Sequence, residues 1–299
     1  MTPIQSLEIS RRPDVVRSAD LPIRKRRRSG RKRANRVLRG GAIFMVLAVL
    51  LFPLVWMFVS SFKTTLEVID PAKFFDFKPT LDNYRLIVEE YDFLSFIKNS
   101  FIVAFASTLI GLIAGVPAAY GVARYRVKNA TAFVLLARVI PGISLLVPWY
   151  FLFSQLRMVG GFPVLILTHA FVTMPLVVAL MAGFFDGVPI ELEEAAQIDG
   201  LTRIGAFLRV SLPLSVPGLA TSAILCFIFS WNNFLFALVL SNEQTRTLPV
   251  AISNFTAYAA VDWGGLMAAS VVITLPVIIV ALFAQKYVVS GLTAGATKG

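Results

Sequence analysis

Six long apolar segments are the feature of this sequence that most restricts its fold. Their bounds are 42–62, 101–123, 131–153, 162–185, 218–240 and 266–287. Each is long enough to cross a hydrocarbon core of roughly 30 Å as a helix, and 57% of the chain is hydrophobic, more than a soluble domain carries. Backbone exposed to lipid must satisfy its own hydrogen bonds, which favours helices, and the segments are too long for barrel strands. The sequence therefore predicts an all-α polytopic membrane protein with six transmembrane helices.

A run of basic residues, 24–33, precedes the first apolar segment and carries much of the net charge of +11. Such a run also fits a nucleic-acid or nuclear-localisation patch. Its position directly before a predicted span favours a cytoplasmic anchor under the positive-inside rule, which also attracts anionic lipid headgroups. The loops on the same predicted side contain further basic residues: Arg124, Arg126, Lys128, Arg203, Arg209, Lys286 and Lys298. We therefore expect cytoplasmic termini, a lipid membrane around the chain and no nucleic-acid partner.

These features divide the chain into three predicted regions. Residues 1–39 form a basic, disordered cytoplasmic segment, because they contain too few aliphatic residues to offset the entropy of ordering. Residues 40–290 form the six-helix transmembrane domain, and residues 291–299 form a cytoplasmic C-terminal tail. The single cysteine, Cys226, lies in an apolar segment and is expected to pack as a small hydrophobic residue.

The loop between the fourth and fifth segments, 186–217, is polar and longer than a simple reconnection needs. Pro189 precedes a stretch rich in Glu and Ala, 190–197, which predicts a short helix. Gly200 is expected to form a left-handed turn, and Thr202 is expected to cap a second helix. From the residues alone, two interpretations are open: a docking surface for a soluble partner, or an amphipathic helix lying flat on the membrane.

The spacing within this loop resembles the cytoplasmic loop of ABC importer permeases. The pattern consists of Glu-Ala-Ala at 194–196, Gly200, Val210 and Leu-Pro at 212–213. Val210 stands where that pattern usually has Ile. The resemblance covers the chain from about Arg39 onward, and it is to the carbohydrate-uptake branch of these permeases, which includes the smaller permease of the maltose system.

The resemblance implies contacts with an ATPase. In that family the loop is a coupling helix, seated in a cleft of a cytoplasmic ATPase subunit. The residues implied to make this contact are Glu194, Ala195, Ala196, Asp199, Gly200, Leu201 and Phe207. The C-terminal residues are similar to a tail that reaches into the ATPase dimer, and this implies contacts at Thr293, Ala294 and Gly295. Taken alone, a tail of Gly, Ala and Thr is a flexible end.

The resemblance also implies a heteromeric complex in the bacterial cytoplasmic (inner) membrane. Its other members are a second permease subunit, two copies of a cytoplasmic ATPase subunit and an extracytoplasmic substrate-binding protein. ATP is bound by the partners, so the chain itself is expected to hold no cofactor. The expected function is binding-protein-dependent carbohydrate transport, with this permease forming half of the translocation pathway for a sugar, oligosaccharide or polyol by alternating access.

Polar groups inside the apolar segments are candidates for the substrate pathway. Trp231, Asn232 and Asn233 combine amides with an aromatic ring, as sugar sites do, but hydrogen bonding between helices explains the amides equally well. Arg138 in the third segment is expected to line an inner cavity or to bond a carbonyl freed by Pro141. The alternative for Arg138 is that its side chain extends to the membrane interface.

The sequence lacks the motifs of several other functional classes. It contains no Walker A motif, so this chain is not expected to be the ATPase itself. No catalytic or metal-binding constellation is present, and the lone His169 is expected to be packed and hydrogen-bonded. The chain is therefore not expected to be an enzyme. The alternative function is a stand-alone secondary transporter of a small polar solute, which usually needs carboxylates within its spans, and none of the six predicted spans contains Asp or Glu.

Overall fold

The computed structural model describes the backbone of residues 29–125, 134, 136, 139–256 and 261–296, and it divides the chain into two compact units, 1–53 and 54–299. Over the described residues the fold is helical, with two isolated β-bridges and no strand. The long helices are α1 (Ser29–Ser60), α4 (Phe93–Tyr125), α6 (Gly142–Gln155), α7 (Phe162–Asp186), α11 (Val216–Trp231) and α14 (Trp263–Ala296). The short elements are α2 (Thr65–Ile69), η1 (Pro71–Lys73), α3 (Asp82–Glu89), α8 (Ile190–Ile198), α9 (Arg203–Ala206), η2 (Phe207–Ser211), α10 (Leu212–Leu214), α12 (Leu235–Leu240), α13 (Leu248–Ala251) and η3 (Ile252–Phe255).

Within the part of the chain that the structure describes, four helices are long and apolar enough to cross a membrane: α4, α7, α1 from Arg36 onward, and α14 up to Phe283. They correspond to the predicted first, second, fourth and sixth segments. A fifth candidate span appears if α9–α10 and α11 are counted together, although their axes are bent by 76°. The predicted third segment, 131–153, is described as a helix from Gly142 onward, and part of it lies outside the described residues.

Several predicted boundaries differ from the structure, among them those of the first and the fifth segments. The first helix begins at Ser29, within the region 1–39 that was predicted to be disordered. Adding residues to an existing helix gains one hydrogen bond for each residue fixed, so the apolar span extends into the basic residues before it. The predicted fifth segment, 218–240, is not one continuous helix, because α11 ends at Trp231 and α12 begins at Leu235.

Helices α4, α7 and α11 form the centre of unit 54–299. Gly115 allows α4 to approach α7 closely, because a Cβ atom there would lie only 2.8 Å from Val177 Cγ1. Cys226 is fully buried in this contact, as the sequence predicts. His169 is also buried, and its Nδ1 lies 2.8 Å from Ser230 Oγ, which confirms that it is packed and hydrogen-bonded.

A second hydrophobic cluster joins α14 to α3, α4, α11 and α13. Its members are Ile87, Phe93, Phe96, Ala104, Trp231, Leu248, Ala251, Phe255, Ala268, Ala269 and Ile273. Trp231 anchors this cluster, because its Nε1 donates a hydrogen bond of 3.1 Å to the Ile273 carbonyl of α14. The break after α11 therefore begins at a residue that is fixed to a neighbouring helix.

A buried lysine organises the segment that follows α1. Lys63 is 0% exposed, and its Nζ donates hydrogen bonds to the carbonyls of Lys73 (3.1 Å) and Phe74 (2.9 Å). The same ammonium lies 4.6 Å from the ring centre of Trp56 and 4.5 Å from that of Phe77. Desolvation by burial lowers the pKa of Lys63, and the nearby Glu67 carboxylate partly offsets it. These contacts hold η1 and the residues after it against the end of α1.

Candidate functional site

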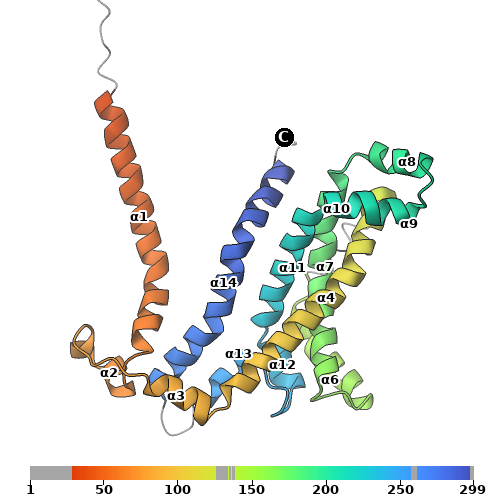
Figure 1. Cartoon of the computed structure of the whole chain (residues 1–299). Coiled ribbons are helices and arrows are strands. Elements are labelled where there is room, and N and C mark those ends of the chain that lie inside the picture. Colours follow the sequence, from red (N-terminus) through yellow and green to blue (C-terminus); the bar gives the residue numbers. More distant parts are fainter. Residues whose placement is uncertain (1–28, 126–133, 135, 137–138, 257–260, 297–299) are drawn as a thin grey trace, which may run out of the picture. The chain divides into compact units, whose positions relative to one another are not determined.

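The polar loop 186–217 folds into a short helical hairpin at one end of α4, α7 and α11 (Figure 1). The predicted helix after Pro189 is α8, and Gly200 has a φ of +95°, which confirms the predicted left-handed turn. Thr202 caps α9, since its Oγ1 accepts a hydrogen bond of 3.1 Å from Gly205 N. The predicted second helix is present and begins with α9, and after Ala206 it continues as the π-helical turn η2, in which hydrogen bonds skip an extra residue.

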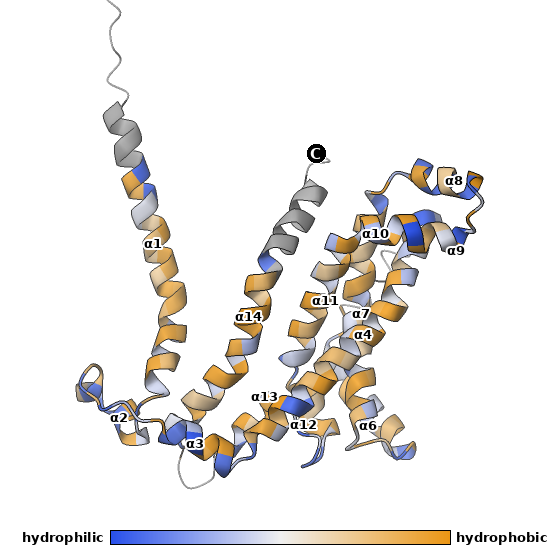
Figure 2. Ribbon diagram, in the orientation of Figure 1, coloured by the Kyte–Doolittle hydropathy of each residue, from blue (hydrophilic) through white to orange (hydrophobic). Residues whose placement is uncertain are grey.

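The outer surface of this hairpin carries most of the residues that were predicted to contact an ATPase. Glu194, Ala195, Asp199 and Gly200 are exposed, and Ala196 and Leu201 are half-buried. Ile198, at the end of α8, is an apolar side chain that is 86% exposed. Figure 2 shows hydrophilic residues on α8 and α9, in contrast to the apolar lengths of α7 and α11. The surface therefore combines carboxylates with small and apolar residues.

Phe207 lies differently, because its ring packs within its own chain. Its centre is 4.6 Å from that of Tyr120 on α4 and 5.9 Å from that of Phe185 on α7. The Tyr120 and Phe185 rings are in turn 5.5 Å apart. This aromatic cluster joins the hairpin to two long helices, so much of the Phe207 surface is covered by this chain rather than offered to a partner.

Glu193 is the residue of the hairpin that sequence reasoning missed. It is 4% exposed, whereas Glu191 and Glu194 on the same helix are exposed. Its Oε1 accepts a hydrogen bond of 2.7 Å from Arg124 Nε and another from Ser211 Oγ. Its Oε2 accepts one of 2.6 Å from Tyr120 OH. The carboxylate therefore has three donors, two of them on α4.

The charge of Glu193 is stabilised despite its burial. Desolvation alone would raise the pKa of the carboxyl, but hydrogen bonds from Ser211, Tyr120 and Arg124, together with the Arg124 charge, outweigh it and hold the pKa below its ordinary value. Arg124 is nearly buried too, and its Nη2 donates a hydrogen bond of 3.0 Å to the Val188 carbonyl just before α8. Removing one partner of such a buried pair costs about 3–5 kcal/mol, because the other charge is left uncompensated.

The second candidate site is the break between α11 and α12. The backbone of Asn232, Asn233 and Phe234 is not helical, although the surrounding residues are apolar. Asn232 is exposed, and its Nδ2 donates a hydrogen bond of 2.9 Å to the Ile228 carbonyl, one turn back on α11. Asn233 Oδ1 accepts a hydrogen bond of 3.2 Å from Phe236 N at the start of α12. The two amides therefore close the two helix ends on either side of the break.

Trp231 differs from these amides, because its ring is not available at a surface of the structure. It is 1% exposed and stacks on Phe227, with 5.7 Å between the ring centres. The candidate pathway residue thus packs between helices in this conformation, while Asn232 beside it remains accessible. Arg138, the fourth candidate, lies outside the described residues. Residues 293–295 continue helix α14, which the sequence did not predict for the tail.

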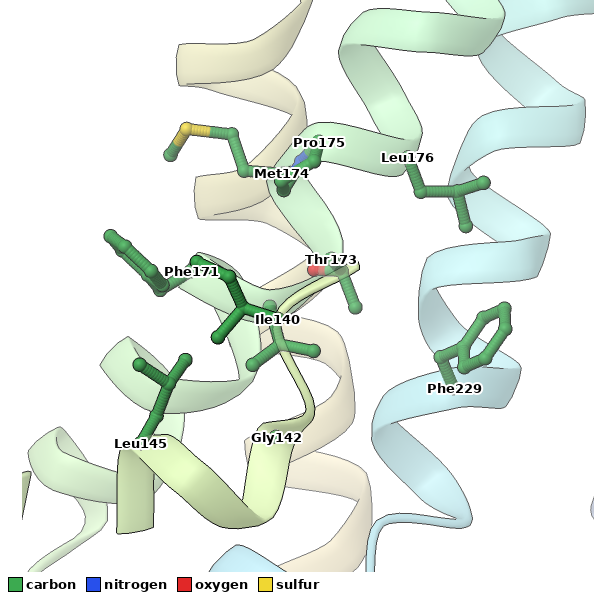
Figure 3. Close-up of a pocket in the computed structure, with 10 residues that line it drawn as sticks. Ile140, Gly142, Leu145, Phe171, Thr173, Met174, Pro175, Leu176 and Phe229 are labelled. Atoms are coloured by element: carbon green, nitrogen blue, oxygen red, sulfur yellow. The ribbon is translucent and has the colours of Figure 1, made fainter. Parts of the chain in front are cut away.

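A pocket of about 430 Å³ lies close to this break (Figure 3). It is lined by the start of α6, the middle of α7 and one residue of α11: Ile140, Gly142, Leu145, Phe171, Val172, Thr173, Met174, Pro175, Leu176 and Phe229. Pro175 lies inside α7 and has no N–H to donate, so the carbonyl one turn earlier loses its helical partner at the pocket. The volume of the pocket falls in the range of small-molecule sites, roughly 300–1,000 Å³. Over the described residues, no cluster of three or more His, Cys, Asp or Glu is placed to hold a metal.

Comparison with known proteins identifies relatives over most of the chain. Residues 107–294 match the family described as "Binding-protein-dependent transport system inner membrane component". The sulfoquinovosyl glycerol transport system permease protein SmoH of Agrobacterium fabrum is 37% identical over 89% of this chain and 95% of its own length. The trehalose/maltose transport system permease protein MalG of Thermococcus litoralis is 38% identical, over 87% of this chain and 95% of its own length.

Solved structures show the same fold at lower sequence identity. A bacterial ABC transporter involved in the import of the acidic polysaccharide alginate has a chain that matches with a TM-score of 0.71 and 21% identity. The match covers 86% of this chain and 98% of that one. A chain of the MetNI methionine ABC transporter in an inward-facing conformation matches with a TM-score of 0.55 and 19% identity, over 71% of this chain and 99% of that one.

The family match covers more than half of the chain, and the two relatives exceed 35% identity over nearly their whole length. The relatives are transport proteins rather than enzymes, and the apolar helices α4, α7 and α14 fit a multi-pass membrane protein. The protein therefore belongs to the family of binding-protein-dependent transport system inner membrane components and is an ABC transporter permease subunit.

Proposed function

We propose that this permease imports a carbohydrate or polyol, forming half of a translocation pathway across the bacterial cytoplasmic membrane. The observation that carries the substrate class is the similarity, at 37–38% identity over nearly the whole length, to permeases named for sulfoquinovosyl glycerol and for trehalose and maltose. Six spans and cytoplasmic termini belong to this proposal, with the third span formed by residues 131–153 including α6. The complex contains a second permease, two ATPase subunits that bind the ATP, and an extracytoplasmic substrate-binding protein.

The hairpin α8–α9 is proposed as the coupling element that docks on the ATPase. Its support is the exposed surface of Glu194, Ala195, Asp199 and Gly200, together with the nearly bare apolar side chain of Ile198. The small residues permit close approach of a partner, and the open turn at Gly200 leaves the surface free of bulk. A helix lying flat on the membrane would instead present a continuous apolar face to lipid. The short α8, which carries exposed acids, is better suited to a protein cleft.

The break at 232–234 and the pocket beside α6 and α7 are proposed as this chain's share of the substrate path. Interrupted helices in transporters free backbone groups at substrate sites. Asn232 offers an accessible amide, and Phe171 and Phe229 at the pocket offer aromatic surface. Amides beside aromatic rings suit the mixed polar and apolar faces of a sugar. Trp231 does not line this path but positions it, because its hydrogen bond fixes the start of the break to α14.

The proposal is tested by uptake into proteoliposomes that contain the full complex. The panel consists of maltose, trehalose, a sulfoquinovosyl glycerol, sorbitol and, as a compound of a different class, methionine. We expect ATP-dependent accumulation of at least one carbohydrate or polyol, and none when the ATPase subunits are omitted. Accumulation of methionine alone would overturn the substrate class. Accumulation that follows an ion gradient without ATPase subunits would instead support the stand-alone secondary transporter.

A further inference from the structure

Glu193 connects the hairpin to a helix that is not its neighbour in the sequence. The chain enters the hairpin from α7 and leaves it into α11. The hydrogen bonds of Glu193 lead instead to α4, through Tyr120 OH at 2.6 Å and Arg124 Nε at 2.7 Å. The third donor, Ser211 Oγ, belongs to η2 on the return side of the hairpin. One carboxylate on α8 therefore joins that helix both to η2 and to the end of α4.

The surroundings of this carboxylate make the connection stiff. Arg124 also bonds the Val188 carbonyl at 3.0 Å, which fixes the segment between α7 and α8 to the same guanidinium. The aromatic cluster of Tyr120, Phe185 and Phe207 packs beside it. Since the pair is nearly buried, separating its two charges would leave each of them without its opposite charge and with little solvent. Rotation of the hairpin against α4 would therefore break these buried contacts at a large cost in free energy.

The backbone links from the hairpin to α7 and α11 run through bends. Gly187 and Pro189 lie between α7 and α8, and Ser215 lies at the sharp bend between α10 and α11. A push on α8 through these bends alone would be partly absorbed by changes in backbone angle. The side-chain route into α4 offers no such hinge.

We propose that Glu193, held by Arg124, Tyr120 and Ser211, is a positioning residue that makes α8 and the adjoining end of α4 move as one body. This inference rests on the proposed docking of α8 on an ATPase, and it names α4 as the helix that receives the movement directly. Helix α4 packs along α7 through Gly115, so its displacement also acts on the pocket-lining middle of α7. Glu193 is distinct from Glu194, which is exposed and faces the proposed partner.

The first experiment measures the coupling between ATP hydrolysis and uptake in the reconstituted complex. The variants are Glu193→Ala, Glu193→Gln, Arg124→Ala and the double alanine variant, and the matched control is Glu191→Gln, an exposed acid on the same helix. The probe is the sugar that the wild-type complex accumulates from the panel above. Assembled complexes of the alanine variants should still hydrolyse ATP, with sugar imported per ATP reduced by at least about tenfold. Glu193→Gln, which keeps the shape of the side chain, should lose less.

The double variant separates a shared role from two independent defects. If Glu193 and Arg124 act through each other, the double alanine variant is no worse than the more damaging single variant. Additive losses, or a wild-type ratio of sugar to ATP in the single variants, would overturn the proposed positioning role of Glu193. A wild-type complex that shows no ATP-driven uptake at all would instead refute the proposed function, so the two failures are distinguishable.

A second experiment keeps the test decisive if an alanine variant fails to assemble. Spin labels are attached at Glu191→Cys on α8 and at Tyr125→Cys at the end of α4, which are exposed positions on the two helices proposed to move together. We expect one narrow distance distribution in the wild-type background that does not change when ATP·Mg²⁺ is added. In the Glu193→Gln background the distribution should broaden and shift with ATP. A wild-type distance that changes with ATP, or a Glu193→Gln distance that stays narrow, would contradict movement as one body.

Discussion

Replacement of Gly200 by valine tests the hairpin at the point where its backbone is most unusual. Gly200 has a φ of +95°, a conformation that a β-branched residue adopts at a cost on the order of 1–3 kcal/mol. A Cβ atom at this position would meet nothing within 4 Å, so the penalty comes from the backbone and not from a clash. Such a penalty lowers the population of the native turn by roughly 5- to 150-fold relative to alternatives.

The expected result is a complex that inserts into the membrane but loses its ATPase. The spans do not depend on this turn, because Gly200 is exposed and lies between α8 and α9. The assay is co-purification of the ATPase subunits with the permease pair, followed by substrate-stimulated ATP hydrolysis. Gly200→Asn is the matched control, since asparagine tolerates a positive φ better than other residues with a side chain. Wild-type values for Gly200→Val in both assays would refute the reasoning.

Three further predictions follow from the two candidate sites and the C-terminus. Asn232→Leu should reduce uptake while the complex still assembles. Asn233→Leu should instead lower the free energy of unfolding by about 1 kcal/mol, because it removes the Oδ1 acceptor at the start of α12. Equal effects of the two variants on uptake and on stability would contradict this division. Deleting residues 294–299 should reduce sugar imported per ATP but spare membrane insertion, and an unchanged ratio would assign those residues no role in coupling. The pKa of the Glu193 carboxyl lies below its ordinary value of 4.5, so its attachment to α4 is fully present above that pH and is lost as the pH falls through the lower folded-state pKa. The distribution of distances between the spin labels on α8 and α4 should therefore stay narrow between about pH 8 and about pH 5, and broaden only at lower pH.

The apolar segments and the turn at Gly200 were predictable from the sequence because each depends on local chemistry. A run long enough to span a membrane has few alternatives to a helix, and a glycine between two helical patterns is the expected site of a left-handed turn. The fourth segment, predicted at 162–185, agrees with α7 within one residue. Family membership likewise followed from the spacing of the motif in the loop, and the comparisons confirm it.

The break after Trp231 and the burial of Glu193 depend on contacts that the sequence does not display. Hydropathy cannot distinguish a continuous span from one interrupted by Asn232 and Asn233, although adjacent amides that cap helix ends were a signal that a break was near. Glu193 differs from Glu191 and Glu194 only in the direction in which its side chain leaves α8. Its partner Arg124 is distant in sequence, and the predictions treated that arginine only as a marker of orientation. The π-helical turn that brings Ser211 to the carboxylate has no sequence signature that we recognise.

The most direct test of the account is a cross-link from the exposed face of α8 to an ATPase subunit. Cys226 is the only cysteine of the chain and is buried, so a thiol-attached photo-crosslinker on the variant Ala195→Cys labels the permease at α8 alone. The control position is Phe75→Cys, which is 89% exposed and lies just after η1, outside the hairpin. We predict an adduct between the permease and the ATPase for Ala195→Cys and none for Phe75→Cys. An Ala195→Cys label that reacts with lipid but not with the ATPase, in a complex that still imports sugar, would contradict the central claim that this hairpin is the coupling element.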